Sequence, residues 1–221
     1  MRTPIQFYNE LGVSGLANLK NSKRDKLEFD YILRIINKKQ KILDLACGYG
    51  RVTIPLAKKG YDVKGLDLTP RYITEAKKSA KKQKLKIEFK VGDMRKTPYQ
   101  ENSFDVILCL WTAFNEIIKK SDQIKAIKEM YRILKPDGFV FMDLPCHLNK
   151  KDLKKLGLGD KYIFKKNISY TWFNSIESTP EYRHTKKSLK TLMKLCKIKK
   201  YKIKIGRFGD RKRLLFQFWK T

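Results

Sequence analysis

The sequence predicts an α/β fold in which helices cover both faces of a mostly parallel β-sheet. Short apolar segments alternate with helical segments from residue 41 onward, a succession typical of parallel α/β sheets. The segment 104–110 is apolar on both faces, as a central parallel strand should be. The 221 residues suffice for one domain, and 42% of them are hydrophobic, which is enough to form a buried core.

The elements of the expected sheet follow in order along the chain. We expect parallel strands at residues 41–45, 61–66, 86–91, 104–110 and 139–144. We expect helices between them at residues 51–59, 70–82 and 122–134. Pro70 suits the first turn of the second helix, and Pro136 and Gly138 stop the third.

The pattern changes after residue 145. We expect two antiparallel strands of an insertion, then a helix, then two strands of a closing hairpin, at residues 162–165, 168–173, 188–197, 201–205 and 214–219. The hairpin is expected to run antiparallel to the rest of the sheet. The single expected domain therefore has four parts, at residues 1–40, 41–145, 146–185 and 186–221.

The chain is strongly basic, with 51 Lys and Arg against 22 Asp and Glu and a net charge of +29. Such a charge is typical of proteins that meet phosphate groups, RNA among them, or a membrane surface. Only eleven of the basic residues are Arg, the residue that favours bidentate phosphate contacts, so a Lys-rich composition without such a partner stays open. The C-terminal segment 150–221 carries 22 basic and 5 acidic residues and is where such a partner is expected to bind.

The cysteines and the apolar segments exclude several classes of protein. The four cysteines are far apart, without the spacing of a zinc site or a redox pair: Cys47, Cys109, Cys146 and Cys196. No apolar run is long enough to span a membrane, and Glu10 interrupts the segment where a signal peptide needs apolar residues. We therefore expect a soluble, cytoplasmic protein with reduced thiols, without a metal site and without a membrane partner.

A glycine-containing turn follows the first expected strand. In the segment Asp44–Gly50, Gly48 and Gly50 let the backbone turn sharply, and the helix that begins near residue 51 presents unpaired N–H groups. A dinucleotide fingerprint would need a third glycine where the chain has Thr53. Asp67 ends the second strand, where a carboxylate can accept hydrogen bonds from ribose hydroxyls. The pattern predicts a site for a nucleoside-containing ligand.

These motifs resemble those of the class I, seven-stranded S-adenosylmethionine-dependent methyltransferases. The segment ILDLACGYGRVTIPLAKKG of this chain is similar to the first motif of that family, GLDLT to the second and VGDM to the third. The runs FDVILCLWTAF and ILKPDGFVFMD resemble the fourth strand and the fifth strand with its loop. The resemblance implies a Rossmann-like sheet of seven strands with an antiparallel last strand, S-adenosyl-L-methionine as cofactor, and methyl transfer as activity. Residues 1–40 then form a helical lid and residues 146–185 a substrate cap.

The resemblance also implies roles for residues of the first motif. Gly48 and Gly50 approach the methionine part of the cofactor. Asp44 orients the turn or binds the amino group of the cofactor. Ala46 stands where the family often has glycine, which is a small departure within the cofactor-binding set.

The nucleoside part of the cofactor is implied to meet the later motifs. Asp67 holds the ribose, with Leu68 beside it. Asp93 accepts a hydrogen bond from the adenine amino group, with Met94 next to the ring, and Leu110 lines the rim. The alternative for these aspartates is ordinary turn chemistry, since Asp at a strand end often caps the next helix.

Methyl transfer is an in-line displacement that needs few catalytic residues, because the leaving group is built into the cofactor. A general base helps an amine or hydroxyl acceptor lose its proton. Candidates are Tyr8, Trp111, Asn115, Glu116 and His147, each of which is also compatible with plain packing. His147 lacks a second nearby ligand residue, so a metal role has little support.

Three functions remain open from the sequence. The first is methyl transfer to a small molecule, an acidic metabolite included; the second is RNA methylation with the basic C-terminal surface; the third is cofactor binding by a non-catalytic regulator. The chain lacks the D/N-P-P-Y/F turn of enzymes that methylate base amino groups. Cys146 alone does not provide the cysteines expected of a C5-pyrimidine enzyme. The oligomeric state and the methylated atom are not specified.

Overall fold

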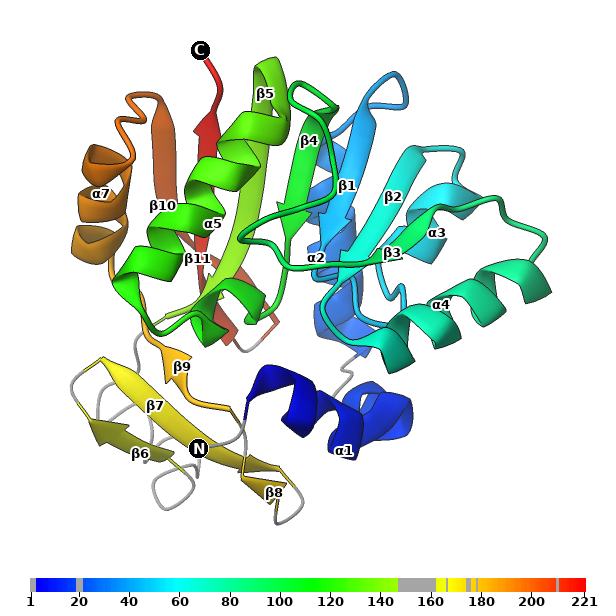
Figure 1. Ribbon diagram of the computed structural model, residues 1–221, viewed down its shortest axis with the longest axis horizontal. Coiled ribbons are helices and arrows are strands. Elements are labelled where there is room, and N and C mark those ends of the chain that lie inside the picture. The colour runs from blue at the N-terminus through cyan, green and yellow to red at the C-terminus, as the bar shows by residue number, and fades with distance from the viewer. Residues whose placement is uncertain are drawn as a thin grey trace.

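A seven-stranded sheet forms the centre of the protein, with the strand order β10-β11-β5-β4-β1-β2-β3 (Figure 1). The computed structural model describes residues 3–18, 22–146, 162–165, 167–173, 176–177, 179–209 and 211–221. The strands of this sheet are β1 (Lys41–Leu45), β2 (Asp62–Asp67), β3 (Phe89–Val91), β4 (Phe104–Cys109), β5 (Leu134–Pro145), β10 (Tyr201–Phe208) and β11 (Arg211–Trp219). The predicted α/β fold with a mostly parallel sheet is confirmed.

The direction of the last two strands corrects the expectation for the closing hairpin. Strand β11 lies between β5 and β10 and pairs antiparallel with both. Strand β10 therefore runs in the same direction as β5, and only β11 is antiparallel to the rest of the sheet. The cause is topological, because a hairpin whose second strand inserts next to the sheet returns its first strand to the parallel direction.

Several strand and helix bounds also differ from the prediction, and two of these differences have a local cause. Strand β3 begins at Phe89 rather than at residue 86. The preceding Leu85 and Ile87 instead pack, half-buried, against the apolar cluster that contains Phe89 and Ala76. Strand β5 begins at Leu134, because this residue pairs with Phe104 before a register shift leads to the main ladder.

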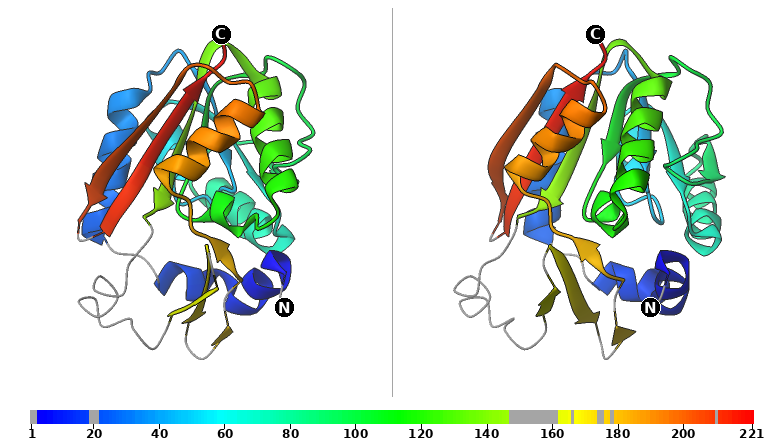
Figure 2. Two further views of the ribbon diagram at one scale, coloured as in Figure 1. Left: turned by 90° about the vertical axis from the view of Figure 1, so that its left-hand side faces the viewer. Right: turned by 60° about the vertical axis from the view of Figure 1, so that its left-hand side comes forward.

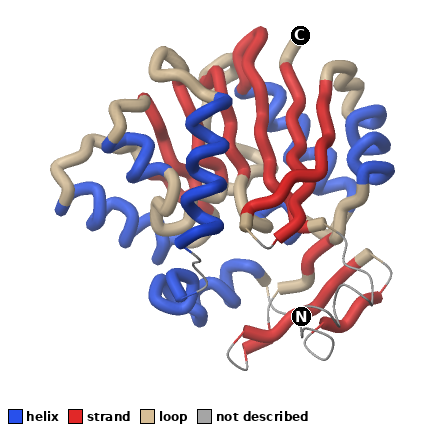
Figure 3. The backbone as a smooth tube through the Cα atoms, turned by 180° about the vertical axis from the view of Figure 1, so that it is seen from behind, coloured by secondary structure: helices blue, strands red, loops and turns tan. Residues whose placement is uncertain are grey.

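Helices cover both faces of the sheet (Figures 1 and 3). On one face, α5 (Lys120–Ile133) and α7 (Lys186–Leu195) bury their apolar sides against the sheet. On the other face lie α2 (Ser22–Ile35) and α3 (Thr53–Lys58). The alternation of side chains along β1 serves both layers, since Leu43 and Leu45 face α5 and Ile42 faces α2.

Local sequence signals set two further helix starts. Pro70 begins α4 (Pro70–Lys82), which buries Tyr72, Ile73, Ala76 and Ala80 at helical spacing. The N-terminus of α7 has a capping box, in which Thr185 and Ser188 each accept a hydrogen bond from the backbone N–H of the other. A short 3₁₀ helix, η1 (Ala113–Glu116), follows β4.

A second layer lies at the carboxyl ends of the parallel strands (Figures 1 and 2). It contains α1 (Pro4–Asn18) and a small antiparallel sheet of β6 (Tyr162–Lys165), β7 (Ile168–Phe173), β8 (Ile176–Glu177) and β9 (Glu181–Tyr182). The expected strands at 162–165 and 168–173 are therefore present and antiparallel. That this segment acts as a substrate cap stays a prediction.

Helix α1 is fastened to α4. Gly12 breaks the regular helix with a φ of 66°, a conformation that glycine adopts without strain. Its carbonyl accepts a hydrogen bond from the Tyr72 hydroxyl at 3.2 Å, and Arg71 Nη1 donates to the Asn9 carbonyl at 2.7 Å. The helix thus lies over the ends of the central strands rather than beside the sheet. Within the described residues, no helix has the length and apolarity of a membrane span.

Candidate functional site

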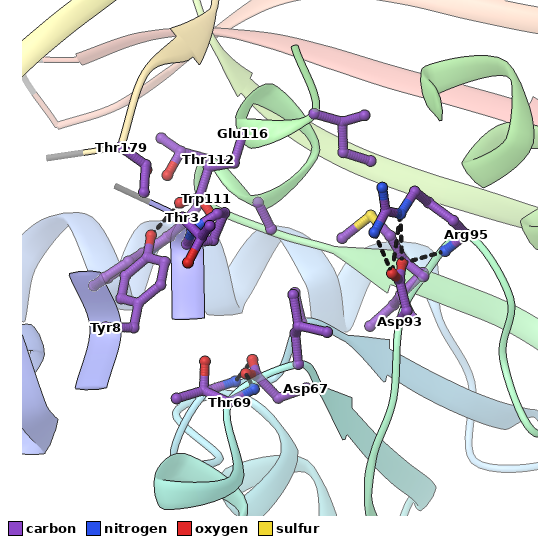
Figure 4. A pocket seen from close by; sticks show the side chains of 18 of the residues that line it. Thr3, Tyr8, Asp67, Thr69, Asp93, Arg95, Trp111, Thr112, Glu116 and Thr179 are labelled. Carbon is purple, nitrogen blue, oxygen red and sulfur yellow. Dashed lines mark hydrogen bonds and ion pairs between the residues drawn. The ribbon is translucent and has the colours of Figure 1, made fainter. Parts of the chain in front are cut away.

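A cavity of about 510 Å³ opens at the carboxyl ends of the central strands. Its floor comes from the segments that follow β1, β2, β3 and β4, and its cover from α1 and the segment before β9 (Figure 4). The predicted cofactor-binding residues that line it are Ala46, Gly48, Asp67, Leu68, Asp93, Met94 and Leu110. Of the predicted catalytic candidates, Tyr8, Trp111 and Glu116 line it.

The turn after β1 has three residues in the left-handed region, Ala46 (φ 65°), Gly48 (φ 55°) and Gly50 (φ 86°). A Cβ at Gly50 would lie 2.9 Å from Cδ1 of Ile54, so this glycine gives the turn its close contact with α3. Gly50 does not line the cavity, and its implied contact with the methionine moiety stays a prediction. Ala46 adopts a backbone conformation that favours glycine. The alanine that replaces the usual glycine is small, but it adds strain to the turn.

Asp67 is held at the end of β2 by two backbone amides. Its Oδ2 accepts a hydrogen bond from Gly48 N at 2.8 Å, and its Oδ1 accepts one from Thr69 N at 2.8 Å. Burial raises the pKa of this carboxyl, and these hydrogen bonds only partly offset the effect. Each carboxylate oxygen keeps a further lone pair that can accept a hydrogen bond from a ligand hydroxyl.

Asp44 lies behind the turn and lines a smaller cavity of about 60 Å³ rather than the main one. Its Oδ2 accepts a hydrogen bond from the Thr53 hydroxyl at 2.6 Å, which ties β1 to the start of α3. Burial raises the pKa of Asp44 to about 6. Of the two roles that the resemblance implies for Asp44, this geometry accounts for the orientation of the turn.

Asp93 is paired with Arg95, a residue that the sequence analysis did not single out. The guanidinium donates to the Asp93 carboxylate from Nη2 at 2.6 Å and from Nε at 2.9 Å, and Arg95 N donates at 2.8 Å. Burial alone would raise the pKa of Asp93, but the hydrogen bonds from Arg95 outweigh it and lower the pKa. Both residues line the cavity, so Arg95 also meets whatever binds beside Asp93.

Two buried residues that the sequence analysis missed hold Trp111, which has a φ of 60° at the end of β4. Trp111 N donates to Asp143 Oδ1 at 2.5 Å, and its carbonyl accepts from Arg213 Nη2 at 2.6 Å. Asp143 and Arg213 form an ion pair at 2.7 Å. Burial raises the pKa of Asp143 even though Arg213 and Arg51 lower it.

The Trp111 ring is covered by the Arg51 guanidinium, whose carbon lies 4.3 Å from the ring centroid. Arg51 in turn forms an ion pair with Glu28 of α2 at 2.6 Å. A cation over an indole face is favourable, and the pair joins α2 to the turn after β1. A Glu inside an amphipathic helix gives no sequence signal that distinguishes it from a surface residue.

Tyr8 and Glu116 meet across the cavity cover (Figure 4). The Tyr8 hydroxyl donates a hydrogen bond to Oε1 of Glu116. Burial raises the pKa of Glu116 to about 8; the hydrogen bond from Tyr8 lowers it, and the charges of Glu181 and Asp67 raise it. Of the catalytic candidates, these two are brought into direct contact.

Asn115 lies elsewhere. It is fully buried, it does not line the cavity, and its Nδ2 donates to the Tyr182 carbonyl at 2.7 Å, so it joins η1 to β9. His147 lies outside the described residues. Among the residues that the structure describes, no group of three His, Cys, Asp or Glu side chains is arranged to hold a metal ion.

Part of the chain is similar to known methyltransferases. Residues 42–138 match the model of a family described as a methyltransferase domain. Over these residues the chain is similar to methyltransferases, in agreement with the resemblance of its motifs. The chain is 40% identical over 103 residues to a demethylmenaquinone methyltransferase of Lactobacillus johnsonii. The aligned residues cover 44% of this chain and 41% of that protein.

Other relatives agree with this family. A ubiquinone biosynthesis O-methyltransferase of Pelagibacter ubique is 36% identical over 128 residues, or 57% of this chain and 50% of that protein. The chain thus spans about half the length of these curated relatives or less. A crystal structure of an S-adenosylmethionine-dependent methyltransferase from Clostridium acetobutylicum has the same fold, with a TM-score of 0.70, 18% identity, and 97% of this chain and 98% of that chain covered.

The family's cofactor is S-adenosylmethionine, and the residues of the cavity fit it. Asp67 offers carboxylate lone pairs to hydroxyl donors at the end of β2. Leu68, Met94 and Leu110 supply apolar surface for a planar base. The cation of a sulfonium is compatible with a lining that includes Asp67, Asp93, Glu116 and Asp122.

Proposed function

We propose that this protein transfers the methyl group of S-adenosylmethionine to a small-molecule acceptor. The main support is the cover of the cavity, because Thr3, Pro4 and Tyr8 of the N-terminal segment and Thr179 and Pro180 overlie the strand ends. A cavity of about 510 Å³ with such a cover suits the cofactor and a small acceptor. Two relatives are named for the methylation of demethylmenaquinone and for ubiquinone biosynthesis, which also supports a small acceptor.

The residues of this chain would bind and orient the cofactor and the acceptor and keep water away from them. When bound, the cofactor supplies an electrophilic methyl group on a sulfonium with a thioether as leaving group. Asp67 accepts hydrogen bonds from the ribose hydroxyls, and the turn at Gly48 lets the backbone approach the ligand closely. Helix α1 contributes Pro4, Tyr8 and Leu16 to the cavity wall, which limits the space in which acceptor and methyl group can align.

Calorimetry with S-adenosylhomocysteine, the demethylated cofactor, tests the cofactor site. We expect binding to the wild-type protein and a loss of affinity of about 10-fold or more in Asp67→Ala, because one lost charge-assisted hydrogen bond is worth roughly 1.5–3 kcal/mol. Asp62→Ala is the matched control, since Asp62 is the exposed first residue of the same strand. Equal affinity of both variants and the wild type would contradict the proposed site.

Isotopically labelled cofactor and fractionated cell extract test the acceptor. We expect label in the small-molecule fraction. Binding of the demethylated cofactor without transfer to any fraction would instead support the non-catalytic regulator. Label in RNA would support the alternative acceptor.

The RNA alternative is supported by exposed basic residues on β10, namely Lys202, Lys204 and Arg207. Strand β10 is the edge of the sheet, and lysines on an edge strand also prevent pairing with other chains. The exposed charges are therefore compatible with either role, whereas the covered cavity favours the small acceptor.

A further inference from the structure

The cover of the cavity contains a half-buried pair of ionisable side chains that the cofactor site does not account for. Glu116 reaches the cavity from η1, after β4, and Tyr8 reaches it from α1. Their hydrogen bond joins two segments that are 108 residues apart in the chain. A carboxyl group that is partly removed from water and lines a ligand cavity is a candidate for contact with the ligand.

The groups that surround this carboxyl are acidic or aromatic. Among the described residues, the titratable groups that interact electrostatically with Glu116 are Tyr8 of α1, Tyr72 of α4, Cys109 of β4, Asp67 of β2 and Glu181 of β9. Glu181 is itself paired with Arg183 at 2.9 Å. The negative charges of Glu181 and Asp67 both disfavour a second negative charge at this position.

The charge of the cavity wall differs from that of the chain as a whole. The chain has a net charge of +29, yet among the described residues that line the cavity four of the six Asp, Glu, Lys and Arg side chains are acidic. One of the two basic side chains, Arg95, is paired with Asp93 and Asp122. A negatively charged acceptor would meet Asp67 and Glu116 here. A cationic acceptor would be attracted by them.

We propose that the acceptor is a small aliphatic amine that binds as an ammonium ion, and that Glu116 is the general base that takes its proton. This inference rests on the proposed methyl transfer and specifies the acceptor class and a catalytic residue for it. Tyr8 is a positioning residue, because its hydroxyl holds Oε1 of Glu116 and leaves Oε2 for the ligand.

The proton and electron balance is simple. The Glu116 carboxylate removes one proton from R–NH₃⁺ and becomes a carboxylic acid, while the nitrogen gains a lone pair. That lone pair forms the new N–C bond, the C–S bond breaks, and its electron pair stays on sulfur, which becomes a neutral thioether. The product is R–NH₂⁺–CH₃, and Glu116 returns its proton to solvent.

The half-buried position of Glu116 in the cavity wall suits this task. Its pKa is raised to about 8, which lies between the ordinary values of a carboxylate and an ammonium group. A base with a pKa near the working pH is the most effective proton acceptor. An ammonium ion beside Glu116 stabilises the carboxylate form, so the ligand itself brings the base into its active state.

Calorimetric binding of three matched compounds tests the acceptor class without turnover. Benzylamine, benzyl alcohol and benzoate share one ring and differ in the charge of the head group. In the presence of saturating S-adenosylhomocysteine, we expect benzylamine to bind the wild-type protein about 10-fold or more tightly than the other two, as an ion pair in a shielded site provides at least this discrimination. Benzoate or benzyl alcohol binding as tightly as benzylamine would overturn the proposal.

The variant Glu116→Gln keeps the size of the side chain and removes its charge. We expect it to lose the preference for benzylamine and, in assays of methyl transfer from labelled cofactor to benzylamine, to lose about 10²-fold or more in kcat. Glu101→Gln is the matched control, since Glu101 is exposed and lies outside the cavity. A Glu116→Gln variant that keeps the preference for benzylamine would overturn the role of Glu116.

The affinity for S-adenosylhomocysteine separates this proposal from the proposed function. We expect the same affinity, within about twofold, in wild type, Glu116→Gln and Glu101→Gln, which also shows that each variant is folded. A wild-type protein that does not bind this compound would contradict the proposed methyltransferase function itself. Normal binding without a preference for the amine would contradict only the acceptor class.

Discussion

The backbone amide of Gly48 donates a hydrogen bond to the carboxylate of Asp67 across 2.8 Å, so the turn after β1 and the end of β2 form one unit. Thr69 N holds the other oxygen of the same carboxylate. Asp67 thus has a structural contact and a predicted ligand contact in one side chain. These two contributions can be separated by measuring stability with and without ligand.

Ligand binding should stabilise the protein through Asp67. A saturating concentration of S-adenosylhomocysteine is expected to raise the midpoint of thermal unfolding of the wild type, with a free energy of about 2.7 kcal/mol at 100 times Kd. Asp67→Ala is expected to have a lower midpoint without ligand and a much smaller increase with it. Thermal unfolding followed by circular dichroism measures both. An equal increase in Asp67→Ala and Asp62→Ala would contradict this prediction.

The hydrogen bond from Tyr8 should set the pH profile of methyl transfer. This bond stabilises the charged form of Glu116 and lowers its pKa, so Tyr8→Phe removes that effect and raises the pKa further. A general base acts in its deprotonated form; the rising limb of kcat against pH is therefore expected to move to higher pH in Tyr8→Phe. A rate profile from pH 6 to pH 10 measures it. An unmoved or lowered limb would contradict the positioning role of Tyr8.

The same carboxyl should make stability depend on pH. The folded-state pKa of Glu116, about 8, lies above the ordinary value of a glutamate, so folding favours the protonated form. The contribution of this group is fully present below the unfolded pKa and is lost as the pH rises through the folded pKa. We expect the free energy of unfolding of the wild type to fall relative to that of Glu116→Gln between about pH 5 and pH 8. Urea unfolding at several pH values measures this difference, and a constant difference would contradict it.

Ala46 offers a test of backbone strain. Its φ of 65° is costly for any residue with a Cβ, by roughly 1–2 kcal/mol, and glycine relieves this at the expense of greater freedom in the unfolded chain. Ala46→Gly is therefore expected to raise the free energy of unfolding by about 0.5–1 kcal/mol. Ala76→Gly, inside α4, is the control and should lower it by about 1 kcal/mol or more. Denaturant unfolding measures both, and a destabilised Ala46→Gly would count against strain at this turn.

Cys146 should not take part in the reaction. It is half-buried beyond the end of β5 and packs against the main apolar cluster, and it is absent from the lining of the cavity. Cys146→Ser is expected to keep methyl transfer within about twofold of the wild type. An inactive but folded variant would indicate covalent addition to a pyrimidine acceptor.

The salt dependence of RNA binding tests the basic edge of the sheet. Each phosphate contact lowers the logarithm of the affinity by about one unit per tenfold increase in salt concentration, so binding of bulk tRNA through several lysines would fall steeply. For a small-molecule enzyme we expect weak tRNA binding, the same in wild type and in a Lys202→Ala, Lys204→Ala double variant. Fluorescence anisotropy between 50 and 300 mM salt measures it. A steep decrease that the double variant reduces would favour the RNA alternative.

Local signals in the sequence predicted much of the fold. Strand β1 and helix α4 have the predicted bounds, because an apolar strand and a proline at the first turn are properties of a short segment. The direction of β10 could not be obtained in this way. It depends on which strand lies between β10 and β5, and nothing in a strand's own residues specifies its neighbour.

The same distinction holds for the site. Asp67, Met94 and Leu110 were predicted from motifs and line the cavity. Asp143 and Arg213 were not predicted, because their contacts with Trp111 span 32 and 102 residues of the chain and a charged residue in an apolar strand gives no signal of its partner. The charge of Arg95 was likewise overlooked beside Asp93. These are contacts of the folded chain rather than of a motif.

The hydrogen bonds of Asp143 and Arg213 to the Trp111 backbone determine how much of the chain the pocket requires. The match to the family model ends at residue 138, whereas Asp143 and Arg213 both lie beyond it. A fragment truncated where the match stops would retain Asp67 and Asp93 but lack both groups that grip the Trp111 peptide. Asp143 of β5 and Arg213 of β11 therefore position the cavity wall that follows β4. The pocket depends on these two strands as well as on the sequence motifs.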